Sequence, residues 1–142
     1  MKNDWTIRLM TPADYSAVSA LWSCTPGIGM NDIDDSRMGI ERYLDRNPNT
    51  CFVAETNSDL VGAILCGHDG RRAFIYHLAV HPDYRHQGIG SSLVSTAIAA
   101  IEKEKIHKIA LVAFENNEAG NAFWEKQGFI KRNDLIYRNR AL

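Results

Sequence analysis

The stretch "HPDYRHQGIGSSL", residues 81–93, decides how this sequence is interpreted. It lies between an apolar run, Ile75–Val80, and a long pattern typical of a helix. Gly88 and Gly90 flank one isoleucine where that helix should begin, although glycine is a weak helix former. Because glycine has a conformational cost at this position, we expect the bare backbone of the junction to serve a ligand.

The junction of a strand and a helix is a natural place to bind an anion. The N–H groups of a helix's first turn have no partner inside the helix, and the helix dipole attracts negative charge to them. We therefore expect this backbone to bind a diphosphate, an interpretation that competes with a simple tight turn. The residues of this expected cradle are Arg85, His86, Gln87, Gly88, Ile89, Gly90 and Ser91.

Size, charge and cysteine content narrow the class of protein. The 142 residues fit one domain, 1–142. With 16 Lys and Arg against 17 Asp and Glu, the chain offers no broad basic surface, so we expect no nucleic-acid partner. The chain shows neither a signal peptide nor a membrane-spanning stretch, which favours a soluble, cytoplasmic protein without a membrane partner. We interpret Cys24, Cys51 and Cys66 as free thiols.

Apolar periodicity predicts alternating strands and helices without repeats. Thr11, Pro12 and Asp14 form a helix start, and Asp34 or Asp35 should cap the second helix. The continuous apolar character of 108–114 predicts a strand buried in the sheet centre. The expected helices are 12–23, one from about 35 to 47, 88–105 and 118–127, and the expected strands are 5–9, 51–55, 60–66, 74–80, 108–114, 129–131 and 135–138.

The stretch Val80–Gly90 resembles the acyl-CoA-binding motif of the GNAT superfamily of N-acetyltransferases, V-x-P-x-x-R-x-x-G-x-G. The resemblance extends over the chain through "IRLMTPADYSAVSALW", "LVGAI", Asn117 and "FWEKQGF". It implies a GNAT-like α/β fold: a mixed, mostly antiparallel sheet of about seven strands, four helices and a splayed parallel central strand pair. It also implies acetyl-CoA as the acyl donor, with the amides of about 86–91 on the pyrophosphate of coenzyme A.

In this family the fourth and fifth strands separate, and the pantetheine arm of coenzyme A lies between them. Here the resemblance implies that backbone groups of Leu78 and Val80 face the pantetheine arm or the thioester oxygen. A backbone N–H at that place would act as an oxyanion donor. Asn117 matches the family's asparagine that touches the pantetheine arm, and it is equally suited to cap the following helix.

The residues that usually transfer protons in the family are absent. Trp124 stands where many members have a tyrosine proposed to protonate the thiolate, and an indole is no practical acid. Val112 stands where some members have a glutamate base, and Phe74 and Tyr76 where others have glutamate or histidine. Deprotonating an alkylammonium at neutral pH costs about 4 kcal/mol, so the amine side of the reaction needs help.

Two residues are the catalytic candidates for that proton. In a regular strand Tyr76 shares a face with Phe74 and Leu78, toward the acceptor, where it could order a water. Glu55 could take the proton through water, although a solvated strand end explains it more simply. His77 lies on the opposite face of a regular strand, so we interpret it first as a core or interface histidine. The histidines match no metal-binding spacing, and we expect no metal.

The acceptor is the least defined part of this interpretation. In the family the segment after the first helix walls the acceptor pocket, and here Asp32, Asp34 and Asp35 would favour a cationic amine unless they only cap the second helix.

The sequence predicts an acyl-CoA-dependent N-acyltransferase, with acetyl-CoA as donor, acting on a primary amine of a small molecule or peptide by direct attack on the thioester. The alternative is a non-catalytic acyl-CoA-binding or sensing module. A nicotinamide-binding oxidoreductase is a weaker third hypothesis, because Leu93 replaces the third glycine of G-x-G-x-x-G. The acyl-chain preference and the oligomeric state stay open, with a homodimer among the options.

Overall fold

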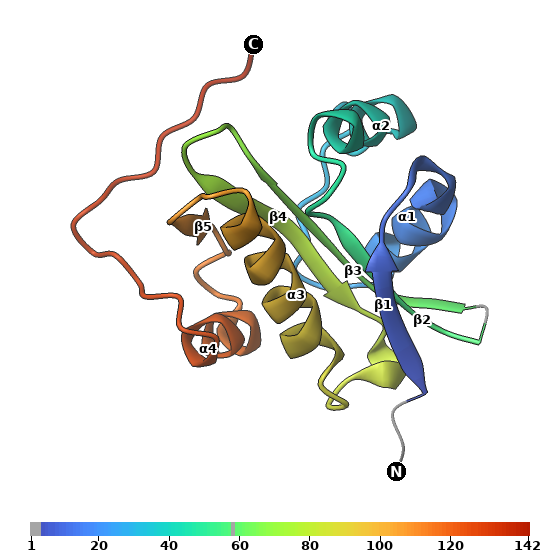
Figure 1. The fold of residues 1–142 in the computed structure, drawn as a ribbon. Helices are drawn as coiled ribbons and strands as arrows, with labels where there is room; N and C mark the ends of the chain where they lie inside the picture. The colour runs from blue at the N-terminus through green and yellow to red at the C-terminus, as the bar shows by residue number, and fades with distance from the viewer. Residues whose placement is uncertain (1–3, 58) are drawn as a thin grey trace. The chain divides into compact units, whose positions relative to one another are not determined.

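The computed structural model describes residues 4–57 and 59–142, which form two compact units divided after Val112. The first unit holds a sheet with three α-helices, and the second holds one short helix and an extended C-terminal segment (Figure 1). The elements are β1 (Trp5–Leu9), the 3-10 turn η1 (Pro12–Asp14), α1 (Tyr15–Ser23), α2 (Arg37–Arg46), β2 (Phe52–Thr56), β3 (Asp59–His68), β4 (Ala73–Val80), the 3-10 turn η2 (Pro82–Tyr84), α3 (Ile89–Lys103), β5 (Ile109–Leu111) and α4 (Glu118–Lys126).

The sheet is mixed, as the sequence predicts, with the order β1-β2-β3-β4-β5. The first four strands pair antiparallel, and β4 pairs with β5 in parallel. The expectation of about seven strands is wrong, because the described residues form five and the segments 129–131 and 135–138 are not strands. Ile130 is 85% exposed and Ile136 78% exposed. Two short apolar runs without a neighbouring strand do not form a stable hairpin in water.

The fifth strand also differs from its prediction. It spans only Ile109–Leu111 instead of 108–114, and it lies at the edge of the sheet rather than at its centre. Val112, directly after it, is 55% exposed. Continuous apolar character therefore did not signal burial here, since no described strand pairs with the outer edge of β5.

The sheet of the first unit carries helices on both faces (Figure 1). The helices α1 and α2 pack on one face, where Trp22 and Leu44 join a core with Val53, Leu65 and Ala79. The helix α3 packs on the other face through five buried apolar residues: Ile89, Leu93, Val94, Ala97 and Ile101. Their spacing is the helical stripe that the sequence predicts.

The helix starts are confirmed in part. Ahead of α1, the carboxylate of Asp14 accepts the backbone N–H of Thr11 at 2.8 Å, as expected of a capping box. The cap of α2 is Ser36, whose Oγ accepts the N–H of Gly39 at 3.0 Å, so the prediction of Asp34 or Asp35 is wrong. Asp35 is buried and its carboxylate makes other contacts, which leaves the next residue to cap the helix.

Candidate functional site

The strand β4 changes its pairing with β3 at Tyr76. Before this point Ile75 pairs with Cys66, and after it His77 pairs with Leu65. Neighbouring residues of β3 thus face residues of β4 that are two positions apart, and Tyr76 is the extra residue of a β-bulge. Because a bulge adds one residue, the backbone groups after it that would have faced one edge of the strand face the other edge instead.

The exchange turns the backbone of Leu78 and Val80 away from β3. The N–H of His81 donates to the carbonyl of Val61 at 2.8 Å, so His81 faces β3. Backbone groups alternate along an antiparallel pair, and those of Leu78 and Val80 therefore point to the opposite edge. Only the first three residues of β4 pair with β5, so this edge is open beyond Ile75. The splayed parallel pair is present, at the side of the described sheet.

The open edge leads directly into the glycine junction. After the short turn η2, Gly88 has a φ of +85° and precedes the first residue of α3. The first helical hydrogen bond runs from the N–H of Ser92 to the carbonyl of Gly88 at 3.0 Å, which leaves the amides before it at the helix end. The Arg85 Nε donates to the carbonyl of Val80 at 3.3 Å and joins the junction to the edge of β4.

The expected cradle residues therefore run from the end of η2 into the first turn of α3. Arg85 and His86 are exposed, and the backbone of His86 is left-handed, with a φ of 63°. Ile89 is the exception among them, because its side chain is buried beneath α3 while its amide belongs to the first turn. A Cβ added to Gly88 would meet no atom within 4 Å, so the backbone there faces open space.

The bulge also corrects the expected orientation of side chains on β4. The rings of Phe74 and Tyr76 lie together, with centroids 4.8 Å apart, and Tyr76 contacts Tyr43 of α2 at 5.8 Å. His77 packs edge-on against Trp22 of α1 at 4.9 Å, on the same helical face as Tyr76. The prediction that Leu78 shares the face of Tyr76 while His77 does not is wrong, since it assumed a strand without a bulge.

His77 forms a buried pair that the sequence did not reveal. Its Nε2 lies 2.9 Å from Oδ1 of Asp35, and the two side chains are 11% and 7% exposed. Burial raises the pKa of Asp35, but hydrogen bonds from His77 and the Asn31 amide outweigh it and hold the pKa below its usual range. The pair ties the segment before α2 to β4. The residues are 42 positions apart, and no local pattern links them.

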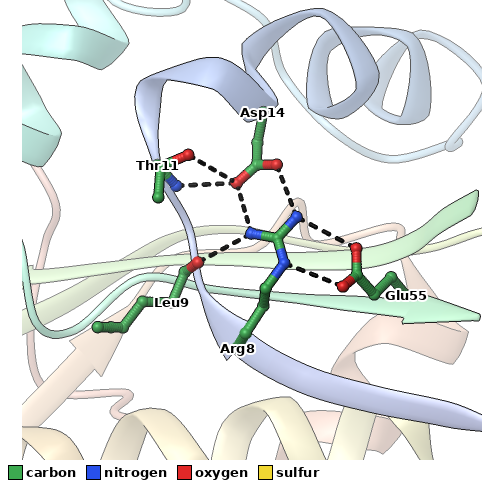
Figure 2. A network of polar contacts seen from close by, with 5 residues as sticks. All are labelled: Arg8, Leu9, Thr11, Asp14 and Glu55. Carbon is green, nitrogen blue, oxygen red and sulfur yellow. Dashed lines mark hydrogen bonds and ion pairs between the residues drawn. The ribbon is translucent and has the colours of Figure 1, made fainter. Parts of the chain in front are cut away.

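Glu55 has a structural partner instead of a place at the open edge. Its carboxylate accepts hydrogen bonds at 3.1 Å from Nε and Nη2 of Arg8, and Nη1 and Nη2 of Arg8 donate to Asp14 at 2.9 Å (Figure 2). The strand β3 separates Glu55 on β2 from β4. This network joins β1, β2 and η1 and gives Glu55 a structural role, while its role in proton transfer stays a prediction.

The second unit holds Asn117 and Trp124. The side chain of Asn117 accepts the N–H of Gly120 at 3.1 Å and caps α4, one of its two expected roles. Trp124 packs between Phe123 and Phe129, with ring centroids 5.0 Å and 5.2 Å away. The contact of Asn117 with pantetheine stays a prediction.

The described part of the chain has neither a membrane-spanning helix nor a cluster of metal ligands. Residues 4–57 and 59–142 contain no helix long and apolar enough to cross a bilayer. Over the same ranges, no group of three or more His, Cys, Asp or Glu side chains is placed to hold a metal ion.

Comparisons with known proteins agree on one family. Residues 15–129 match the acetyltransferase (GNAT) family. The chain is 36% identical to an acetyltransferase of Pectobacterium atrosepticum over 121 residues, 84% of each protein, and 31% identical to an acetyltransferase of Yersinia pestis over 137 residues, 96% of this chain and 95% of that one. The fold matches the PaiA N-acetyltransferase from Thermoplasma acidophilum, solved with coenzyme A, at a TM-score of 0.76 and 20% identity over 87% and 88% of the two chains.

Proposed function

The chain belongs to the GNAT family of acetyltransferases, and on that premise we propose that it transfers the acetyl group of acetyl-CoA to a primary amine of a small molecule or peptide. One observation carries the proposal: the open edge of β4 at Leu78 and Val80 continues into the Gly88 junction. A long, thin ligand with a diphosphate at one end can follow this path, held by backbone groups throughout.

The Gly88 junction fits the diphosphate of the donor. The first-turn amides of α3 supply hydrogen-bond donors where the helix dipole favours negative charge. The φ of Gly88 and the open space at its Cβ position let a ligand approach the backbone closely. The exposed guanidinium of Arg85 adds positive charge at the same place.

The open edge of β4 fits the thioester. When the amine nitrogen attacks the carbonyl carbon, negative charge develops on the carbonyl oxygen, and an N–H of Leu78 or Val80 would stabilise it. Loss of such a donor in other acyl-transfer sites slows the reaction about a hundred- to a thousandfold. The carbon–sulfur bond then breaks and the thiolate leaves, so no covalent enzyme intermediate is needed.

Tyr76 is our candidate for ordering the water that removes the amine proton. It is the bulge residue at the point where β4 and β5 separate, and its side chain is 58% exposed. A phenol is a weak base, so its role would be to orient water rather than to accept the proton itself. Replacing Tyr76 by Phe should lower kcat more than it raises the KM for acetyl-CoA.

The second candidate function is a module that binds acyl-CoA without turnover. Trp124 and Val112 stand where family members carry proton-transferring residues, and neither an indole nor an isopropyl side chain can exchange a proton. The two functions differ in whether bound acetyl-CoA reacts when an amine is added.

The test measures thiol release from acetyl-CoA with amino acids, polyamines, aminoglycosides and short peptides as acceptors, alongside acetyl-CoA binding by calorimetry. We expect amine-dependent release, and at least tenfold weaker acetyl-CoA binding in Gly88→Ala. Gly70→Ala is the matched control, because Gly70 also has a positive φ and open space at its Cβ position but lies in the β3–β4 turn. Tight binding without release across the acceptors would favour the binding module, and equal binding in both variants would contradict the cradle.

A further inference from the structure

A small hollow lies at the opposite end of β4 from the glycine junction. It measures about 270 Å³ and is bounded by the starts of the parallel strands β4 and β5. The N–H of Ala73 donates to the carbonyl of Lys108 at 3.0 Å, which fixes the two strand starts side by side. The residues that line it include Arg72, Phe74, Tyr76, Lys108, Ala110 and Asp69.

The parity of the two strands explains why these side chains gather. Residues 72, 74 and 76 alternate along β4 and its start, and residues 108 and 110 alternate along the neighbouring strand. Phe74 pairs with Ala110, whose methyl group is too small to fill the space beside the aromatic ring. As a result, the aromatic side chains of Phe74 and Tyr76 lie between the bulge and the two cationic residues, Arg72 and Lys108.

The two cations are only partly neutralised by the described residues. Neither Arg72 nor Lys108 forms an ion pair with any residue in 4–57 or 59–142. The carboxylate of Asp69 offsets only one of the two positive charges, and its Oδ1 accepts the backbone N–H groups of Arg71 and Arg72 at 2.8 Å each. These hydrogen bonds from Arg72 and Arg71 lower the pKa of Asp69 and keep it in the turn. The hollow therefore presents net positive charge.

We propose that this hollow binds a carboxylate of the acetyl acceptor, so that the preferred acceptors are short peptides with a free C-terminal carboxylate. An arginine and a lysine that line one hollow without an ion pair suit a carboxylate, which an arginine binds through two hydrogen bonds. The inference rests on the proposed function, since it places the acceptor's amine at Tyr76 and its carboxylate at Arg72.

The dimensions set the length of the acceptor. From Arg72 to Tyr76 the strand advances about 13 Å at its usual rise per residue. An extended peptide advances about 3.3–3.6 Å per residue, so four residues span the distance, and three span it if the long side chain of Arg72 reaches about 2–3 Å toward the bulge. A free amino acid is too short to place its amine at Tyr76 while its carboxylate contacts both cations.

The test compares two acceptors that differ only at one end: trialanine and trialanine amide, both with a free N-terminal amine. We expect the wild-type kcat/KM to be at least tenfold higher for the free acid. In the double variant Arg72→Gln with Lys108→Gln this preference should fall below about twofold. The control Arg71→Gln removes the neighbouring arginine, which does not line the hollow, and should keep the preference. Ala110→Leu, which fills the hollow, should raise the KM for trialanine and leave acetyl-CoA binding unchanged.

Direct binding separates this inference from the proposed function. Trialanine binding is measured by calorimetry in the wild type and in the double variant, with acetyl-CoA absent. Acetylation of both peptides at equal rates, with equal binding, would overturn the carboxylate site and leave the transferase intact. Selective binding of the free acid without thiol release from any amine would overturn the transferase and keep the carboxylate site. If the free acid did not bind selectively and no amine caused thiol release, both the carboxylate site and the transferase would be overturned.

Discussion

At the scale of single residues, Arg8 has the most consequential set of polar contacts. Its guanidinium donates to Asp14 and Glu55 at once, and Asp14 also accepts the N–H of Thr11 (Figure 2). Three elements, β1, η1 and β2, therefore depend on one cation. Burial raises the pKa of Asp14, but the hydrogen bonds from Arg8 and Thr11 outweigh it and lower the pKa below its usual range.

This shift predicts a stability difference that depends on pH. Because the pKa of Asp14 is lower in the folded state, its contribution is fully present above the ordinary aspartate pKa of about 3.9 and is lost as the pH falls through the folded value. Asp14→Asn should cost about 1–2 kcal/mol at pH 7, and the difference should shrink below about pH 4. Urea unfolding of both proteins from pH 3 to pH 7 measures it.

The control for this prediction is Asp45→Asn. Asp45 is exposed on α2 and makes no ion pair with any described residue, so its replacement should leave the unfolding free energy nearly unchanged at every pH. A cost for Asp14→Asn that stayed constant from pH 7 to pH 3 would show that the carboxylate charge is not what stabilises this network.

At the scale of elements, the contact of α3 with the sheet positions the glycine junction. Gly62 of β3 lies under this helix, and a Cβ there would come within 3.0 Å of Ile89 Cγ2 and 3.1 Å of Leu93 Cδ1. Ile89 and Leu93 both belong to the first turns of α3. A larger residue at position 62 would therefore push the start of the helix away from the sheet.

This packing predicts a graded effect of side-chain size. Gly62→Val should destabilise the protein by about 1–3 kcal/mol, because extra atoms in a well-packed core force backbone shifts. Gly62→Ala should cost less. Acetyl-CoA binding should weaken in the same order, as measured by chemical denaturation and calorimetry on the same samples. If the Gly62→Val variant were destabilised but bound acetyl-CoA as tightly as the wild type, the glycine junction would not depend on how α3 packs on the sheet.

Local patterns in the sequence were sufficient for some elements and misleading for others. The stripe from Ile89 to Ile101 and the start at Thr11 predict α3 and α1 correctly, since both depend on neighbours within a few positions. The bulge at Tyr76 was not predictable, because apolar residues occupy both alternating sets of positions in 73–80 and no pattern marks where the register changes. The pair of Asp35 with His77 depends on a contact across 42 positions, so Asp35 was assigned to the wrong role.

At the scale of the whole molecule, the family is established by a match along most of the chain, whereas the candidate site is defined by the local geometry of β4 and the start of α3. The family match covers 15–129, whereas the backbone edge at Leu78 and Val80 and the Gly88 junction are observed in the first unit. The GNAT resemblance led from the glycine motif to these residues, and their contact with coenzyme A stays a prediction. Arg72 and Lys108 lie outside the motifs that carry the resemblance, so the hollow beside Phe74 and Tyr76 was found from the structure.

The most direct test of the site is amide hydrogen exchange along β4, resolved by NMR, with and without saturating acetyl-CoA. We expect the N–H groups of Leu78 and Val80 to exchange at least tenfold more slowly when acetyl-CoA is bound. Those of His77 and Ala79 already face β3 and should change little, so they serve as controls in the same spectrum. Unchanged exchange at Leu78 and Val80 with acetyl-CoA bound would contradict the central claim that the open edge of β4 holds the donor.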